Sequence, residues 1–153
     1  MRIKKMLPAL TLSMTLMLAG TGMVHASLEK PDIYVNNQKL DISAGMGSAG
    51  VTYVPFRPIF EKFNMKVTWD KDKKSVTATN GSTTIVLTHN SYEAYVNGKK
   101  IKLIAPPFLD PTDGLFNVNL RFIAETLGAK VTWSKKGNDA VIYIEDSNIN
   151  KIK

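Results

Sequence analysis

Apolar and polar residues alternate along several short stretches of the chain, the pattern typical of half-buried β-strands. The first two pairs of stretches are 32–35 with 39–42, around Asn36-Asn37, and 95–96 with 99–103, around Asn97-Gly98. Asn-Gly favours the positive φ angles of a type I′ turn, so the second pair is a strong hairpin signal. The pattern therefore predicts two β-hairpins.

Two further stretches carry apolar residues at helical spacing. These residues are Phe56, Ile59, Phe60 and Phe63 in the first stretch and Leu120, Ile123, Ala124 and Leu127 in the second. Pro55 and Pro58 are expected in the first helical turn, where N–H groups lack partners in any case. Asn119 is the expected N-cap of the second helix. Asn64 and Gly128 tolerate the left-handed conformation and are expected to end the helices.

Strands are expected again after each helix. Residues 66–69 and 130–133 both read Lys-Val-Thr-Trp, which places the valine and the tryptophan on one face. The strands expected next are 75–79 and 83–88 in the first half, joined at Asn80-Gly81, and 140–145 in the second half, after a connection at 134–139. The Gly- and Pro-rich segments 43–50 and 105–114 are expected to be loops.

These elements occur twice because the chain repeats itself. Residues 54–69 align with 118–133 at an offset of 64, with eight of the 16 positions identical, and Tyr34-Val35-Asn36 recurs as Tyr95-Val96-Asn97. One such unit cannot bury its helix and tryptophan face alone, whereas two can. We therefore expect an α+β fold of two tandem repeats, about 32–88 and 92–145, each a β-hairpin, loop, short helix and two strands. They are expected to pack as one antiparallel-sheet domain with pseudo-twofold symmetry.

The N-terminal segment has the pattern of a secretory signal peptide. Arg2, Lys4 and Lys5 precede an uncharged apolar run, and Val24-His25-Ala26 fits the small-x-small cleavage rule. We expect residues 1–26 to be a signal peptide, 27–146 the domain and 147–153 a flexible tail. Fraying is expected to begin at Asp146, the last residue of the domain. The alternative is an uncleaved anchor, but the run is short for a span of about 20 apolar residues. No later segment is long and apolar enough to span a membrane.

Composition and charge narrow the class of protein. The chain has no cysteine, which excludes disulfides and thiolate chemistry and favours an exported bacterial protein. The formal charge of +7 falls to +4 without the three basic residues of the signal. Lysine clusters at 71–74 and 99–102 suit an anionic envelope polymer, although a solvated face is the preferred interpretation. The chain has neither a basic stripe nor an RNA-binding motif, so nucleic-acid binding is not predicted.

No catalytic, cofactor or metal site is predicted. His89 is the only histidine after residue 26. One mature chain therefore cannot supply a multi-histidine copper site, and a Ser-His-Asp triad would have to use His89. No Gly-x-Ser-x-Gly, Walker or Rossmann glycine pattern is present. Neither Asp70 with Asp72 nor Asp110 with Asp113 suggests two carboxylates that face each other across a sugar.

Several repeated or loop residues have both a functional and a structural interpretation. Arg57 and Arg121 could bind an anion, or make an ion pair or a carbonyl clamp. Because Arg before Glu is the poorer helical order, loop carbonyls are the expected partners. Trp69 and Trp133 could form a sugar platform, but a core role is favoured. The weak candidates for partner contact, against a satellite apolar cluster, are Tyr53, Phe108 and Phe116.

The motifs that carry a family resemblance are Val54-Pro55-Phe56-Arg57-Pro58-Ile59, the hairpin at 95–101, Pro106-Pro107-Phe108-Leu109-Asp110 and the segment 120–133. Together they make residues 32–145 similar to the copper amine oxidase N-terminal-like domain, or stalk domain, of exported Gram-positive proteins. Asn119 stands where that family usually has proline, and residues 62–65 depart from Thr-Leu-Gly-Ala. The resemblance implies an appendage without copper or quinone. Residues 88–93 have only a faint likeness to the quinone precursor motif, because Ser91 separates Asn90 from Tyr92.

These observations predict a secreted, non-catalytic binding or scaffold module that acts at or outside the bacterial cell envelope. Association with the cell wall after export is an open alternative to release. Its expected partner is an unknown extracellular protein or an anionic cell-wall polymer. The alternative is a secreted inhibitor or ligand-binding protein that uses the proline-rich loop 105–114. Homodimerisation through exposed strand edges is a further expectation.

Overall fold

The computed structural model describes residues 30–47, 50–136 and 139–146. The predicted signal peptide and the predicted tail 147–153 lie outside the described residues, so both stay predictions. The elements are β1 (Asp32–Val35), β2 (Gln38–Leu40), β3 (Gly45–Met46), β4 (Thr52–Pro55), α1 (Phe56–Lys62), β5 (Lys66–Asp70), β6 (Ser75–Thr79), β7 (Thr84–Thr88), β8 (Glu93–Val96), β9 (Lys99–Lys102), β10 (Phe108–Leu109), β11 (Phe116–Asn119), α2 (Leu120–Thr126), β12 (Lys130–Lys136) and β13 (Asp139–Glu145).

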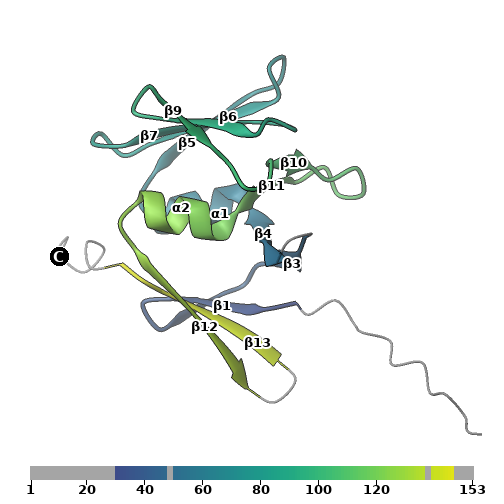
Figure 1. The fold of residues 1–153 in the computed structure, drawn as a ribbon, viewed down its shortest axis with the longest axis vertical. Coiled ribbons are helices and arrows are strands. Elements are labelled where there is room, and N and C mark those ends of the chain that lie inside the picture. Colours follow the sequence, from purple (N-terminus) through teal and green to yellow (C-terminus); the bar gives the residue numbers. More distant parts are fainter. Residues whose placement is uncertain (1–29, 48–49, 137–138, 147–153) are drawn as a thin grey trace, which may run out of the picture.

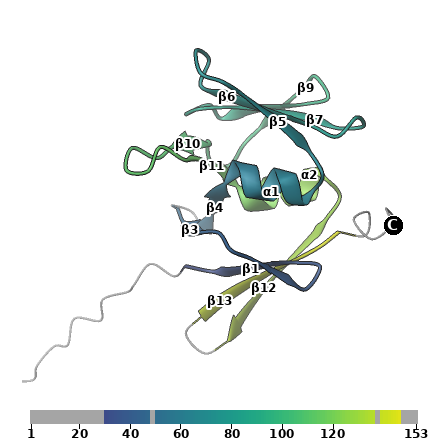
Figure 2. The same cartoon turned by 180° about the vertical axis from the view of Figure 1, so that it is seen from behind.

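The strands form three sheets, and the two helices lie between the larger two. The five-stranded sheet has the order β5-β6-β7-β8-β9, and one four-stranded sheet has the order β12-β13-β1-β2. The helices separate these two sheets in both Figure 1 and Figure 2. The small sheet β10-β11-β4-β3 lies beside the helices. The α+β class is confirmed, but the expected antiparallel-sheet domain is wrong in one respect, because the strands form three sheets and one strand pair is parallel.

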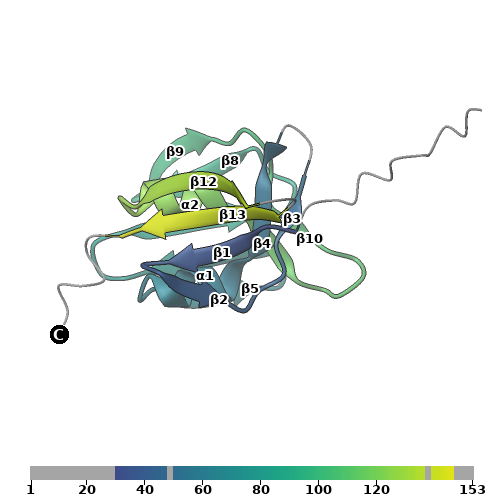
Figure 3. The ribbon, with the colours of Figure 1, turned by 90° about the horizontal axis from the view of Figure 1, so that it is seen from below.

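One strand pair is parallel and joins the two ends of the domain. β1 pairs with β13 in parallel, with Val35 opposite Ile144, and Figure 3 shows the strands of that sheet side by side. In the five-stranded sheet, β7 lies between β6 and β8, and all pairs are antiparallel. Each early hairpin therefore joins the late strands of the other half, an exchange that a local sequence pattern does not specify.

The strands before the helices were not predicted. β4 and β11 pair antiparallel, with Val54 opposite Val118, and each leads directly into a helix. Pro55 is thus the last residue of β4 and the N-cap position of α1, which begins one residue later than expected. The segments predicted as loops also contain short strands, β3 and β10, which pair with β4 and β11.

The predicted N-cap of α2 and the predicted C-terminal ends of both helices are confirmed. The Asn119 side chain accepts a hydrogen bond from the Phe122 N–H at 3.1 Å and caps α2. Asn64 and Gly128 have φ angles of 54° and 82° just past the helices. The N–H of Met65 donates to the Phe60 carbonyl, as expected for a Schellman motif, which requires a left-handed residue.

The asparagines of the two hairpin turns connect distant strands. Asn36 (φ 47°) exchanges two hydrogen bonds with the Asp146 backbone, at 3.0 and 2.9 Å. Asn97 (φ 50°) accepts from the Thr84 N–H at 2.7 Å. Asp146 is 5% exposed and held in place, so the frayed tail does not begin there as predicted. The strand β12 likewise continues to Lys136, through residues that were expected to form a connection.

The core lies where the helices meet the sheets. Ile59 and Phe60 of α1 and Ile123 and Ala124 of α2 are fully buried, together with Val54 and Val118. Burial of this apolar surface is the main stabilising contribution to such a fold. None of the described helices is long and apolar enough to cross a membrane.

Candidate functional site

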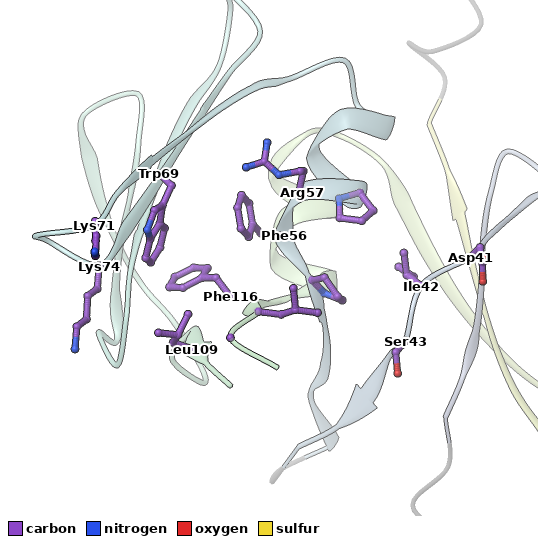
Figure 4. Close-up of a pocket in the computed structure, with 14 residues that line it drawn as sticks. Asp41, Ile42, Ser43, Phe56, Arg57, Trp69, Lys71, Lys74, Leu109 and Phe116 are labelled. Atoms are coloured by element: carbon purple, nitrogen blue, oxygen red, sulfur yellow. The ribbon is translucent and has the colours of Figure 1, made fainter. Parts of the chain in front are cut away.

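An open groove of about 860 Å³ lies between α1, the five-stranded sheet and the small sheet. We call it the aromatic groove (Figure 4). Its lining residues are Asp41, Ile42, Ser43, Pro55, Phe56, Arg57, Pro58, Trp69, Lys71, Lys74, Leu109, Gly114, Leu115 and Phe116. Eight of these are aromatic or apolar, Gly114 aside, so the lining is chiefly apolar.

Three aromatic side chains from distant segments form the floor of the groove. Trp69 ends the β5 pattern, Phe56 opens α1, and Phe116 opens β11. The Phe116 ring centroid lies 5.2 Å from that of Trp69 and 5.9 Å from that of Phe56, in tilted and edge-to-face arrangements. Phe116 is 2% exposed, whereas Trp69 and Phe56 are half-buried and keep surface for a contact.

Three exposed cations surround this floor. The Arg57 guanidinium lies 5.4 Å from the Phe56 ring centroid and 3.9 Å from a Glu61 carboxylate oxygen. Lys71 and Lys74 follow Trp69 in the β5–β6 turn and, among the described residues, make no ion pair with a carboxylate. At the opposite end Figure 4 shows Asp41, the one acid of the lining. The lining at the Trp69 end therefore carries lysines and no acid.

Hydrogen bonds within the β5–β6 turn order the backbone that carries Lys71 and Lys74. The Asp70 carboxylate accepts from the N–H groups of Lys73 at 3.0 Å and Asp72 at 3.1 Å. These bonds, with the Lys73 ammonium at 3.4 Å, hold the pKa of Asp70 below its usual value. Lys74 has φ 48°, a left-handed conformation that disfavours a lysine. Asparagine or glycine would suit this position better, so a strained cation stands at the lip of the groove.

Three hydrogen bonds to its backbone, two of them with side chains, hold the proline-rich segment against the domain. His89 Nδ1 accepts from the Leu109 N–H at 3.0 Å, and the Asn90 N–H donates to the Pro107 carbonyl at 2.8 Å. The Tyr53 hydroxyl donates to the Pro106 carbonyl at 3.0 Å. Leu109 thereby becomes a wall of the aromatic groove, while the turn after it projects from the domain in Figure 1.

The loop aromatics predicted as contact candidates occupy different environments. Phe116 lies in the floor of the groove, as described above. Phe108 packs edge-to-face on Tyr53 at 5.0 Å, beside a smaller cavity of about 220 Å³. Partial burial, with a contribution from Tyr92, raises the pKa of Tyr53. The structure therefore brings Phe116 to the groove and keeps Tyr53 with Phe108 in a separate cluster.

A second cavity of about 170 Å³ has lining residues at equivalent repeat positions. Asn119, Leu120, Arg121 and Trp133 are the counterparts of Pro55, Phe56, Arg57 and Trp69 at the offset of 64. Thr52 likewise stands where the aromatic groove has Phe116. The smaller threonine offers less cover, and Trp133 is 40% exposed. The predicted core role is therefore wrong for Trp133, whereas Trp69 packs against the core and lines the groove.

The expected carbonyl clamp of the arginines is also wrong. Arg121 pairs with Glu125 at 3.3 Å, as Arg57 pairs with Glu61, and all four side chains are more than half exposed. Sequence reasoning did not identify Phe56, Leu109, Lys71 and Lys74 as one site. By sequence each is an ordinary core or surface residue. The one available signal was that Lys71 lies two residues after Trp69.

Among the described residues, no group of three or more His, Asp or Glu side chains could hold a metal ion. Nδ1 of His89 is already engaged as the acceptor of the Leu109 N–H. Residues 34–144 match the family model described as copper amine oxidase N-terminal domain. Comparisons with curated proteins and with solved structures found no significant match.

Proposed function

The chain belongs to the copper amine oxidase N-terminal domain family, and from this premise we propose that it is an exported binding module. In copper amine oxidases this N-terminal domain is a non-catalytic stalk. The module would act at or outside the bacterial cell envelope, through contacts with an extracellular protein or an anionic wall polymer. Its proposed binding site is the aromatic groove.

The aromatic groove is the observation that carries this proposal. It combines partly exposed aromatic surface with three cations, and partly exposed aromatic and arginine side chains are enriched at binding interfaces. Concave sites lined chiefly by apolar and aromatic side chains with a few polar groups are the usual place for a ligand. The N-terminal apolar run and the cleavage pattern before Ser27 support export.

We further propose that the two halves are related by a pseudo-twofold axis that passes between Val54 and Val118. Their antiparallel register supports this, because they are equivalent repeat positions directly opposite each other. The strand orders support it as well, since β12-β13-β1-β2 corresponds to β5-β6-β8-β9 with β7 inserted. The duplication would thus supply a rigid scaffold with one enlarged and one reduced site.

The alternative roles have weaker support. The proline-rich loop contributes Leu109 and Gly114 to the groove and is held by Tyr53 and His89, so we propose it as a wall and not as an inhibitory finger. Dimerisation through the edge strand β9 is disfavoured by three exposed lysines, which oppose edge pairing.

Co-sedimentation of residues 27–153 with cell envelopes of the source organism tests the proposal. This segment contains every described residue, and its sedimentation is to be compared at low and high salt. Binding that is lost when Arg57 and Lys74 are replaced supports the proposed function, and salt sensitivity would identify its charge dependence. Absence of sedimentation, together with no complex with secreted proteins, would refute it.

A further inference from the structure

We propose that the aromatic groove holds an extended acidic segment of a partner polypeptide. An apolar side chain of that segment would lie on the floor formed by Phe56, Trp69 and Phe116, with its carboxylates beside Lys71 and Lys74. This inference rests on the proposed function and selects one of its two partner classes, a protein over a wall glycan.

The chemistry of the floor favours a polypeptide over a sugar polymer. Apart from Arg57, which lies over Phe56, the polar lining side chains are at the ends of the groove, with Asp41 and Ser43 opposite the Trp69 end in Figure 4. Between them lie aromatic, leucine, isoleucine and proline side chains. Sugar hydroxyls buried there would lose water without gaining hydrogen bonds, which is unfavourable. Apolar side chains of a peptide gain free energy from the same burial.

The charge of the rim favours acidic flanking residues. The lining holds three exposed cations and a single aspartate. Of the three lysines in the turn, Lys73 pairs with Asp70, whereas Lys71 and Lys74 have no carboxylate partner among the described residues. The Arg57–Glu61 distance of 3.9 Å leaves the guanidinium weakly engaged. A basic segment would be repelled at the Trp69 end, so the complementary segment carries Asp or Glu there.

The lining residues at the two ends of the groove suit an extended occupant. Lys71 and Lys74 lie beyond Trp69 at one end, and Ile42, Ser43 and Asp41 lie at the other. An extended segment on the aromatic floor would contact both the turn at 70–74 and the segment after β2. A compact small molecule would not require contacts at both ends.

Trp69 supplies the assay. Trp133→Phe leaves Trp69 as the sole tryptophan, and its fluorescence then reports on the groove. The probes are short tryptophan-free peptides: phenylalanine flanked by glutamates, the same peptide with lysines for glutamates, and the same peptide with serine for phenylalanine. Polygalacturonate serves as the anionic glycan. The first peptide is expected to shift the emission of Trp69 at low salt, and the other probes are expected to bind at least about tenfold more weakly.

Two exposed variants locate the contact. The double variant Lys71→Ala, Lys74→Gly is expected to weaken the acidic peptide about fivefold, since each exposed charge pair contributes little. Lys74→Gly also removes the strained φ, so a loss of binding cannot be ascribed to unfolding. The double variant Lys99→Ala, Lys102→Ala, which removes two exposed charges on β9, is the matched control and should leave affinity unchanged. Leu115→Ser, at a side chain already 44% exposed, should weaken the apolar contact about threefold.

The outcomes separate this inference from the proposed function. Tighter binding of polygalacturonate than of the acidic peptide overturns the polypeptide partner but leaves the groove as the binding site. Equal binding of the glutamate and lysine peptides overturns the acidic preference. If no probe moves the Trp69 emission, the polypeptide inference is wrong, and envelope sedimentation still decides the proposed function separately.

Discussion

His89 holds one wall of the aromatic groove, and its replacement is the most informative test of how the fold builds the site. Its Nδ1 atom accepts the Leu109 N–H at 3.0 Å, so the ring proton is on Nε2. His89→Ala removes this acceptor and leaves a part-buried N–H without its partner. His89→Asn keeps an acceptor, because Oδ1 of asparagine, like Nδ1 of histidine, is bonded to Cγ and so lies two bonds from Cβ.

The expected magnitude follows from the loss of one hydrogen bond in a part-buried site. We expect His89→Ala to lower the free energy of unfolding by about 1–3 kcal/mol, the cost of an unsatisfied buried donor. His89→Asn should lower it by less than about 1 kcal/mol, since only ring contacts are lost. Urea denaturation of residues 27–153 at 25 °C measures both values, provided that the m-value stays constant.

Amide hydrogen exchange gives the decisive readout. The Leu109 amide should lose protection in His89→Ala and keep it in His89→Asn, while the β6 amides, which pair on both sides, keep theirs in both. Loosening of Leu109 should also weaken the acidic peptide in the Trp133→Phe background. Equal protection of Leu109 in the two variants would refute the assignment of His89 as the clamp of this wall.

Three further predictions concern the scaffold. Asn36→Gly should lower the free energy of unfolding by about 1–3 kcal/mol through the loss of two hydrogen bonds, measured in urea, whereas Asn37→Gly keeps a positive φ of 65° and should change it little. Hydrogen bonds from Thr112 lower the pKa of Asp110, and turn hydrogen bonds lower that of Asp70, so both contribute stability above the unfolded pKa of about 4. This stability should be lost as pH falls through the lower folded values, and a double Asp→Asn variant should flatten the pH dependence of the melting temperature below pH about 4. Arg121→Ala should change the free energy of unfolding by less than about 1 kcal/mol, and a larger loss would contradict its assignment as an exposed ion pair.

Local features of the chain were predictable because they depend on a few neighbouring residues. Asn97-Gly98 dictates a turn with two positive φ angles, and Asn119 dictates a cap whose partner is three residues away. Asn64 and Gly128 end their helices for the same reason, since few residues adopt the left-handed conformation at low cost. The duplication itself was visible as identity at fixed spacing.

The aromatic groove was only partly predictable. Arg57, Trp69 and Phe116 were singled out one by one, but nothing in their spacing placed Phe116 against Trp69, 47 positions earlier. The identical Lys-Val-Thr-Trp segments also predicted that Trp69 and Trp133 would be buried to the same extent. Their burial differs because their neighbours come from other segments, Phe116 for Trp69 and Thr52 for Trp133.

The repeat could be read from sequence identity, and the hairpin turns and the C-terminal ends of the helices from the conformational preferences of adjacent residues. Long-range packing is what pairs β1 in parallel with β13, places β4 against β11, and brings aromatic and basic side chains together in one groove. Those choices are made by burial and strand pairing between residues far apart in the chain, where local periodicity leaves the partner of each strand unspecified.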